Sequence, residues 1–256
     1  MAIGVSGGAG EARLIGASDY ESNERERNMA AVAKAIENYR KDKGHYPPPA
    51  ILDKDGKPLL SWRVAILPYM ENAWINNNGG PGEKPVNGPK ELYGLFKLDE
   101  PWDGPNNKKL IGRLPSPYRA PWSVLSYSQS SIGKTMVMAA VGKGAIFDPT
   151  KKTVSDVDVR DGLKHTLLAL QLEEPGQAVY WTKPADVELT ADGKLPADGP
   201  NLGRRFAVVY ADGSAHTLAN GLDPKTFLGI VSREGNEAPD EKLIRPEPVK
   251  PVPVPK

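Results

Sequence analysis

The sequence predicts an α+β protein in which an N-terminal amphipathic helix packs on a C-terminal antiparallel β-sheet. Three observations support this class. Met29, Val32, Ile36 and Tyr39 recur at steps of three and four residues, the spacing of one helix face. The second half of the chain contains short apolar or alternating runs between Gly, Pro and Asp residues, which is typical of short strands. The 256 residues include 26 Gly and 25 Pro, a composition that favours turns over long helices.

The helix is expected over residues 22–43. Ser22 or Asn23 can cap its first turn, and Gly44 followed by Pro47 ends it. The face opposite the apolar stripe is expected to be solvated, and it carries Arg25, Arg27, Lys34, Glu37 and Arg40.

The rest of the chain predicts short elements. A strand and a short helix are expected within 59–75, a loop over 76–89 and another short helix over 90–97. Strands are expected over 135–141, 166–173, 178–181, 206–211 and 214–218. Asp212-Gly213 favours a tight primed turn between the last two strands, and Asp223-Pro224 favours the start of a final helix reaching 233.

These elements predict one domain over residues 22–236. Residues 1–21 are interpreted as a flexible leader or cloning remnant. Residues 237–256 contain alternating prolines, which favour an extended polyproline-like tail with no core of its own.

Composition excludes several kinds of partner and chemistry. The net charge of +1 disfavours nucleic acid, which usually requires a basic surplus. No window approaches ~18 consecutive apolar residues, and the N-terminus has no export signal, so membrane contact is expected only through a native N-terminal segment missing here. The absence of cysteine excludes disulfides, thiolate metal sites and cysteine nucleophiles.

No catalytic motif is legible in the sequence. His45, His165 and His216 lie far apart, and none has the spacing of a zinc motif. There is no Gly-x-Ser-x-Gly elbow, and Gly133-Lys134-Thr135 lacks the upstream glycine of a phosphate-binding loop. We therefore expect no enzyme activity, no catalytic residue and no cofactor.

Three aspartates form a candidate metal site. Asp156, Asp158 and Asp161, followed by Gly162, look like part of a calcium loop, but the spacing is not that of an EF-hand. Local capping and solvation are the favoured role of these carboxylates, and metal binding is the alternative.

The tryptophans carry a second candidate site. Trp102 and Trp181 lie beside polar residues, and Asp103 and Asn106 could supply hydrogen bonds to a sugar stacked on the rings. The competing interpretation is that the tryptophans fill a core that is poor in Phe.

Several motifs occur in a fixed order over about residues 22–236. They include Ser61-Trp62-Arg63-Val64 with Leu67-Pro68-Tyr69, the segment from Leu98 to Asp103, Trp181-Thr182-Lys183-Pro184, and Ala211-Asp212-Gly213-Ser214. Together they resemble a paralogous planctomycete family of domains of unknown function, whose members have type IV pilin-like N-termini and a His-x9-Asp-Gly signature. Leu202 occupies the position of the signature histidine and Ala120 that of a usual cysteine, so no metal, catalytic or thiol role is carried over from either.

The resemblance implies a pilin- or pseudopilin-like architecture. In such a protein the first half of a long N-terminal helix anchors in the membrane and the second half packs on the sheet. The resemblance also implies structural roles for Trp62, Arg63, Pro68, Trp102, Trp181, Pro184, Asp212 and Gly213.

Two functional hypotheses remain open at this point. The resemblance implies a non-enzymatic subunit of the cell envelope or secretion apparatus, membrane-anchored in its native form, with like subunits or filament proteins as partners. The alternative is an extracytoplasmic binding module for a glycan or another solute. The exposure of Trp102 and Trp181 discriminates between them: buried rings support the structural subunit, and a solvent-facing pair beside Asp103 supports binding.

Overall fold

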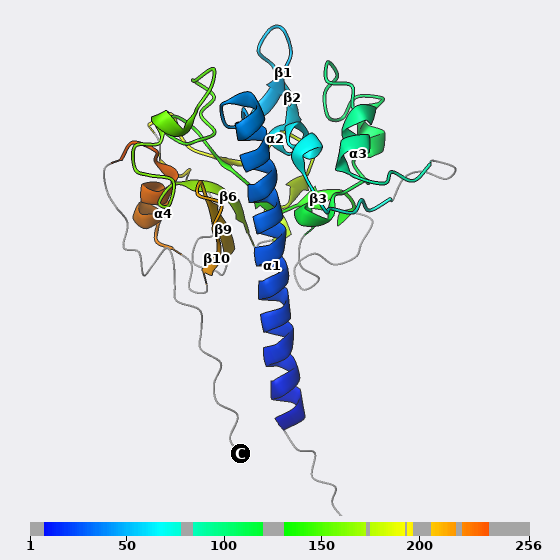
Figure 1. Cartoon of the computed structure of the whole chain (residues 1–256), viewed down its shortest axis with the longest axis vertical. Coiled ribbons are helices and arrows are strands. Elements are labelled where there is room, and N and C mark those ends of the chain that lie inside the picture. Colours follow the sequence, from blue (N-terminus) through cyan, green and yellow to red (C-terminus); the bar gives the residue numbers. More distant parts are fainter. Residues whose placement is uncertain are drawn as a thin grey trace, which may run out of the picture.

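The computed structural model confirms the α+β class (Figure 1). It describes residues 8–77, 84–119, 131–172, 175–192, 194–196, 206–218 and 222–235; the side chains before residue 24 are not described. Helix α1 (Gly8–Lys43) is the longest element. Its C-terminal half packs on the body, whereas its N-terminal half extends away from it.

Helix α1 begins at Gly8, well before the predicted start near residue 22. The segment expected to be a flexible leader is therefore helical over 8–21. No proline interrupts the chain between these residues and the packed half of the helix. Extending an existing helix adds one hydrogen bond per residue fixed, which costs far less than forming a new nucleus.

The apolar stripe of α1 is confirmed as its packed face. Met29, Val32 and Ile36 are fully buried, and the helix contacts strands β6, β9 and β10, whose bounds follow below. Arg25 was expected on the solvated face but is buried. It precedes Met29 by four residues, so it lies on the same stripe, one turn before the apolar residues.

A four-stranded antiparallel sheet supports α1. Its strand order is β10 (Ala215–Leu218), β9 (Phe206–Tyr210), β6 (Leu167–Gln171) and β4 (Val137–Met138). Helix α4 (Pro224–Val231) packs against the opposite face from α1, and Asp223 caps it as predicted, by accepting hydrogen bonds from the backbone N–H groups of Lys225 and Thr226.

The two helices explain why β9 is a continuous apolar run. Ala207 and Val209 belong to the core under α1, whereas Phe206, Val208 and Tyr210 belong to the core under α4. Alternate residues of a strand point to opposite faces, so a strand covered on both sides has no polar positions left.

The hairpin between β9 and β10 is confirmed, but its turn differs from the predicted primed type. Gly213 has φ +85°, whereas Asp212 is not among the residues with positive φ. The Gly213 N–H donates to the Tyr210 carbonyl (2.9 Å), and the Tyr210 N–H donates to the Ser214 carbonyl (3.0 Å). This pattern is a three-residue loop with a glycine bulge. Such a loop requires positive φ at one residue, whereas a type I′ turn requires it at two.

The remaining elements are short, as the Gly and Pro content predicts. The strand pairs are β1 (Ala50–Leu52) with β2 (Pro58–Ser61), β3 (Lys134–Thr135) with β7 (Val179–Tyr180), and the parallel pair β5 (Ala140–Val141) with β8 (Val187–Glu188). The helices are α2 (Trp62–Ala65), α3 (Pro89–Leu95) and the 3-10 turns η1 (Leu67–Tyr69), η2 (Asn107–Leu110), η3 (Ser116–Tyr118), η5 (Asp156–Asp158) and η6 (Pro175–Gln177). Across the described ranges, none of the helices combines the length and apolarity that crossing a membrane requires.

Candidate functional site

A buried ion pair joins the motif that contains Arg63 to the segment that follows the Trp181-Thr182-Lys183-Pro184 motif. Arg63, on α2, is fully buried, and its Nη2 lies 2.6 Å from Oδ1 of Asp186. The same carboxylate oxygen accepts hydrogen bonds from the Trp62 indole N–H (3.1 Å) and the Ala139 backbone N–H (2.8 Å). The Arg63 guanidinium also donates to the carbonyl of Val137 (2.6 Å), on strand β4. This network ties α2 to the central sheet and to the segment before β8.

The electrostatics of this network are those of a structural anchor. Burial raises the pKa of Asp186, and the Arg63 guanidinium and the N–H donors of Ala139 and Trp62 oppose that rise. Each charge is held by several donors or acceptors, so the pair fixes the relative positions of its elements. Pro184, half-buried, lies in the turn just before Asp186, and the Ala185 carbonyl also accepts from Arg63 (3.3 Å).

A second buried ion pair was not predicted from the sequence. Nη1 of Arg233 lies 3.0 Å from Oδ2 of Asp148, and both side chains are almost completely inaccessible to solvent. Asp148 also accepts from the backbone N–H groups of Gly144 (3.0 Å) and Thr150 (2.9 Å). The pair holds the segment after α4 against the loop after β5.

The two tryptophans of the predicted glycan site differ in their exposure to solvent. Trp181 is fully buried, its indole N–H donates to the Ile111 carbonyl (2.9 Å), and its ring packs edge-on against Phe96. Trp102 is half-buried and stacks on Tyr180, with ring centroids 5.4 Å apart. A sugar therefore has no access to the Trp181 ring, and a neighbouring ring already covers one face of Trp102.

The polar residues of that predicted site also have other roles. Asn106 is exposed, but its side-chain amide donates to Glu100 (2.6 Å), and its backbone N–H donates to the other carboxylate oxygen of Glu100 (2.7 Å). Asp103 is exposed beside Trp102. Asp212, in the hairpin turn, accepts a hydrogen bond from the Ser214 N–H (3.0 Å), a contact within the turn itself.

The three aspartates of the candidate calcium loop have separate partners. Asp156 pairs with Arg40 and accepts from the Tyr46 hydroxyl (2.9 Å), Asp158 accepts from the Ser155 N–H (2.8 Å) in a capping box, and Asp161 accepts from the Gly235 N–H (2.7 Å). Within the described part of the chain, no group of three or more His, Asp or Glu side chains is arranged to hold a metal ion.

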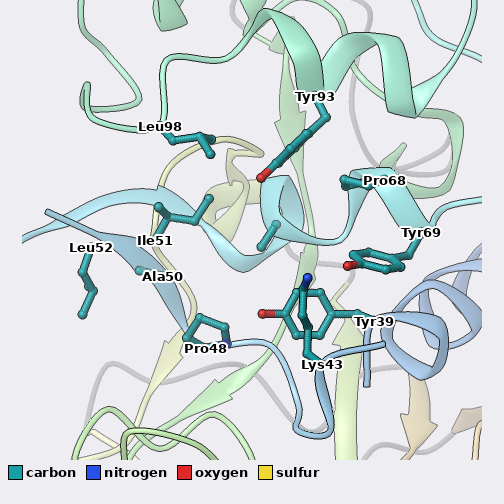
Figure 2. Close-up of a pocket in the computed structure, with 11 residues that line it drawn as sticks. Tyr39, Lys43, Pro48, Ala50, Ile51, Leu52, Pro68, Tyr69, Tyr93 and Leu98 are labelled. Carbon is teal, nitrogen blue, oxygen red and sulfur yellow. The ribbon is translucent and has the colours of Figure 1, made fainter. Parts of the chain in front are cut away.

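A cleft that the sequence did not predict lies between the end of α1, strand β1 and the α2–α3 region (Figure 2). Its volume is about 500 Å³. Three tyrosine rings, two prolines, one lysine and aliphatic side chains line it: Tyr39, Lys43, Pro48, Ala50, Ile51, Leu52, Ala65, Pro68, Tyr69, Tyr93 and Leu98. Pro68, which the resemblance implied to be structural, occupies the first turn of η1 and also forms part of this wall.

The polar side-chain atoms of the cleft come from tyrosine hydroxyls and one ammonium group. The rings of Tyr39 and Tyr69 meet edge-on, with centroids 5.3 Å apart, and the Tyr69 hydroxyl donates to Asp42 (2.6 Å). Lys43 forms an ion pair with the same carboxylate (3.0 Å). Burial raises the pKa of Tyr39 and of Tyr69, which reinforces the protonated form that a tyrosine hydroxyl already has at neutral pH. The cleft therefore offers aromatic faces and hydrogen-bond donors, which suit an apolar ligand rich in acceptors.

Comparison with known proteins identifies the family. Residues 26–221 match the model of a family described as a protein of unknown function, DUF1559. The chain belongs to this family. No curated protein and no solved structure matches the chain.

The DUF1559 match covers the parts of the chain that build both the anchor and the cleft. Arg63, Asp186 and every residue that lines the cleft fall within it, as does the packed half of α1. Helix α4, Arg233 and the proline-rich tail follow its end.

No pattern in the sequence predicted the cleft. Tyr39 was expected only as part of the apolar stripe, and Tyr69 and Tyr93 lie in separate short helices with no shared spacing. Asp186 carried a weak signal, because it follows the Trp-Thr-Lys-Pro block by two residues.

Proposed function

We propose that this DUF1559 protein is a non-enzymatic structural subunit of pilin or pseudopilin type, which assembles with like subunits in the cell envelope. Helix α1 carries the proposal. It spans 36 residues, of which only the C-terminal part packs against the body (Figure 1). A helix that extends so far from its own domain has a backbone placed to pack with helices of neighbouring molecules.

The anchor and the tryptophans support the same function. Trp62 and Trp181 are fully buried and belong to the same hydrophobic core. The Arg63–Asp186 pair links elements that are distant in the sequence. Tertiary contacts that fix distant elements to one another suit a structural subunit. The burial of Trp181 counts against the glycan-binding alternative, because that alternative requires both rings to face solvent.

The envelope location and the filament or secretion partners belong to the same proposal and rest on the motif resemblance. Attachment to a membrane would require a segment with an apolar run longer than any that the described helices contain.

The proposal is tested by crosslinking in the native host. The chain has no cysteine, so single substitutions give unambiguous attachment points. We expect Ala17→Cys, on the extending half of α1, to give a ladder of crosslinked multimers with a short bis-maleimide in the envelope fraction. The control is Asp55→Cys, at an exposed position of the turn between β1 and β2, which should stay monomeric. Monomers from both variants, or multimers from Asp55→Cys alone, would contradict assembly through α1.

A further inference from the structure

The tyrosine-lined cleft has the chemistry of a groove that binds proline-rich peptides. Such grooves place aromatic rings side by side, and proline rings pack against their faces. Here Tyr39, Tyr69 and Tyr93 come from three different elements, and Figure 2 shows their rings turned toward a common space. Leu52 and Leu98 form an apolar rim that is partly exposed, at 52% and 38%. An occupant that covers this rim would remove apolar surface from water.

The hydrogen-bonding groups of the cleft match the same kind of peptide. A proline has no backbone N–H, so a proline-rich segment presents mainly carbonyl acceptors. The cleft contributes donors, namely the ammonium group of Lys43 and the hydroxyls of Tyr39 and Tyr93.

The chain itself contains a segment with these properties. Residues 245–256 read RPEPVKPVPVPK, with prolines at 246, 248, 251, 253 and 255. Prolines at 248 and 251 form a Pro-x-x-Pro pair, the spacing that polyproline-binding grooves recognise. The valines between the prolines supply apolar side chains for the rim of the cleft.

The described structure ends at a place from which this segment can reach the cleft. The Gly235 N–H donates to Asp161 (2.7 Å), and Asp156, in the same short segment, pairs with Arg40. Arg40 lies about one helical turn before Lys43, which lines the cleft. Residues 236–244, which link Gly235 to this segment, extend for about 28 Å at about 3.1 Å each in a polyproline conformation, and the contacts above set the path that they have to cover.

We propose that the cleft formed by Tyr39, Tyr69 and Tyr93 binds the proline-rich tail of its own chain, residues 245–256, in an extended polyproline conformation. The tail is tethered to the same molecule, so binding is intramolecular and is favoured by a high effective concentration. The proline rings reduce the conformational entropy lost on docking. This proposal does not depend on assembly through α1.

The test uses the full chain with a nitroxide attached to Lys256→Cys and with isotopically labelled tyrosine rings. We expect selective loss of ring signal intensity for Tyr39, Tyr69 and Tyr93, which reduction of the nitroxide restores. The signal of Tyr210, which is buried in the core under α4 and does not line the cleft, serves as the internal reference. Equal intensity loss at all tyrosines, or none at the three in the cleft, would overturn the proposal.

Two variants separate specific docking from chance proximity. Replacing the five prolines of residues 245–256 with serine keeps tail length and charge, and it should abolish the selective intensity loss. Leu52→Lys should weaken the intensity loss because it places a charge on the apolar rim, and its exposed position keeps the fold intact. Unchanged intensity loss in either variant counts against the proposal.

A mixing experiment identifies the source of the tail. Chains with labelled tyrosines but no nitroxide are combined with nitroxide-bearing chains that carry no label. Unaffected spectra are expected, because docking occurs within one molecule. Selective loss at the cleft tyrosines in this mixture would assign the bound tail to a second copy and overturn intramolecular docking.

Discussion

Removing the carboxylate of Asp186 should be among the most destabilising single changes in this protein. The substitution Asp186→Ala leaves the guanidinium of Arg63, which is fully buried, without its ionic partner. It also deprives the Trp62 indole N–H and the Ala139 backbone N–H of their acceptor. Breaking one half of a buried pair costs about 4 kcal/mol, a large part of the 5–15 kcal/mol by which domains are typically stable.

The assay is urea unfolding followed by tryptophan fluorescence. The free energy of unfolding is obtained by linear extrapolation, and Trp62, one of the five tryptophans that contribute to the signal, lies at the altered site. The matched control is Asp192→Ala, which removes a carboxylate from the exposed pair with Lys194 (2.6 Å) and should leave stability unchanged.

A double variant tests the coupling itself. Arg63→Met combined with Asp186→Ala removes both charges, so the combined loss of stability should be smaller than the sum of the single losses by about 2 kcal/mol. A loss below about 1 kcal/mol for Asp186→Ala, or strict additivity in the double variant, would falsify the view that the two charges share a water-excluded site.

Further predictions concern the core, the hairpin and the aspartates. Trp181→Ala should cost about 3–5 kcal/mol in urea unfolding and Trp102→Ala clearly less, because only the first ring is fully buried; equal losses would contradict this ranking. Gly213→Ala should lower stability by about 1 kcal/mol through backbone strain alone, since a Cβ there meets no atom within 4 Å, and an unchanged melting temperature would count against this turn geometry. Hydrogen bonds from Ser155 lower the pKa of Asp158 in the folded state, so its contribution is present above the unfolded pKa and is lost as the pH falls through the folded one. Asp158→Asn should therefore reduce the loss of melting temperature on acidification, and an identical pH profile would refute this role. Calcium or a chelator should leave the melting temperature unchanged, because the aspartates of residues 156–161 have separate partners; a calcium-dependent rise would contradict this.

Local patterns predicted much of the fold. The steps of three and four residues from Met29 to Ile36 predicted the packed face of α1, and the Asp223-Pro224 pair predicted the start of α4. These succeeded because a helix face and an N-cap depend on residues within one or two turns of each other. The start of α1 and the hairpin turn were predicted less well, since several backbone solutions are compatible with the same few residues.

The sequence by itself determined the α+β class, the main apolar faces and the motif series. Only the tertiary structure decided how those residues are used. It placed Asp186 against Arg63 across more than a hundred residues, buried Trp181 instead of exposing it beside Trp102, and brought Tyr39, Tyr69 and Tyr93 around one cleft. The physical reason is that periodicity specifies which face of an element is apolar, whereas the identity of the element that covers that face depends on the path of the whole chain.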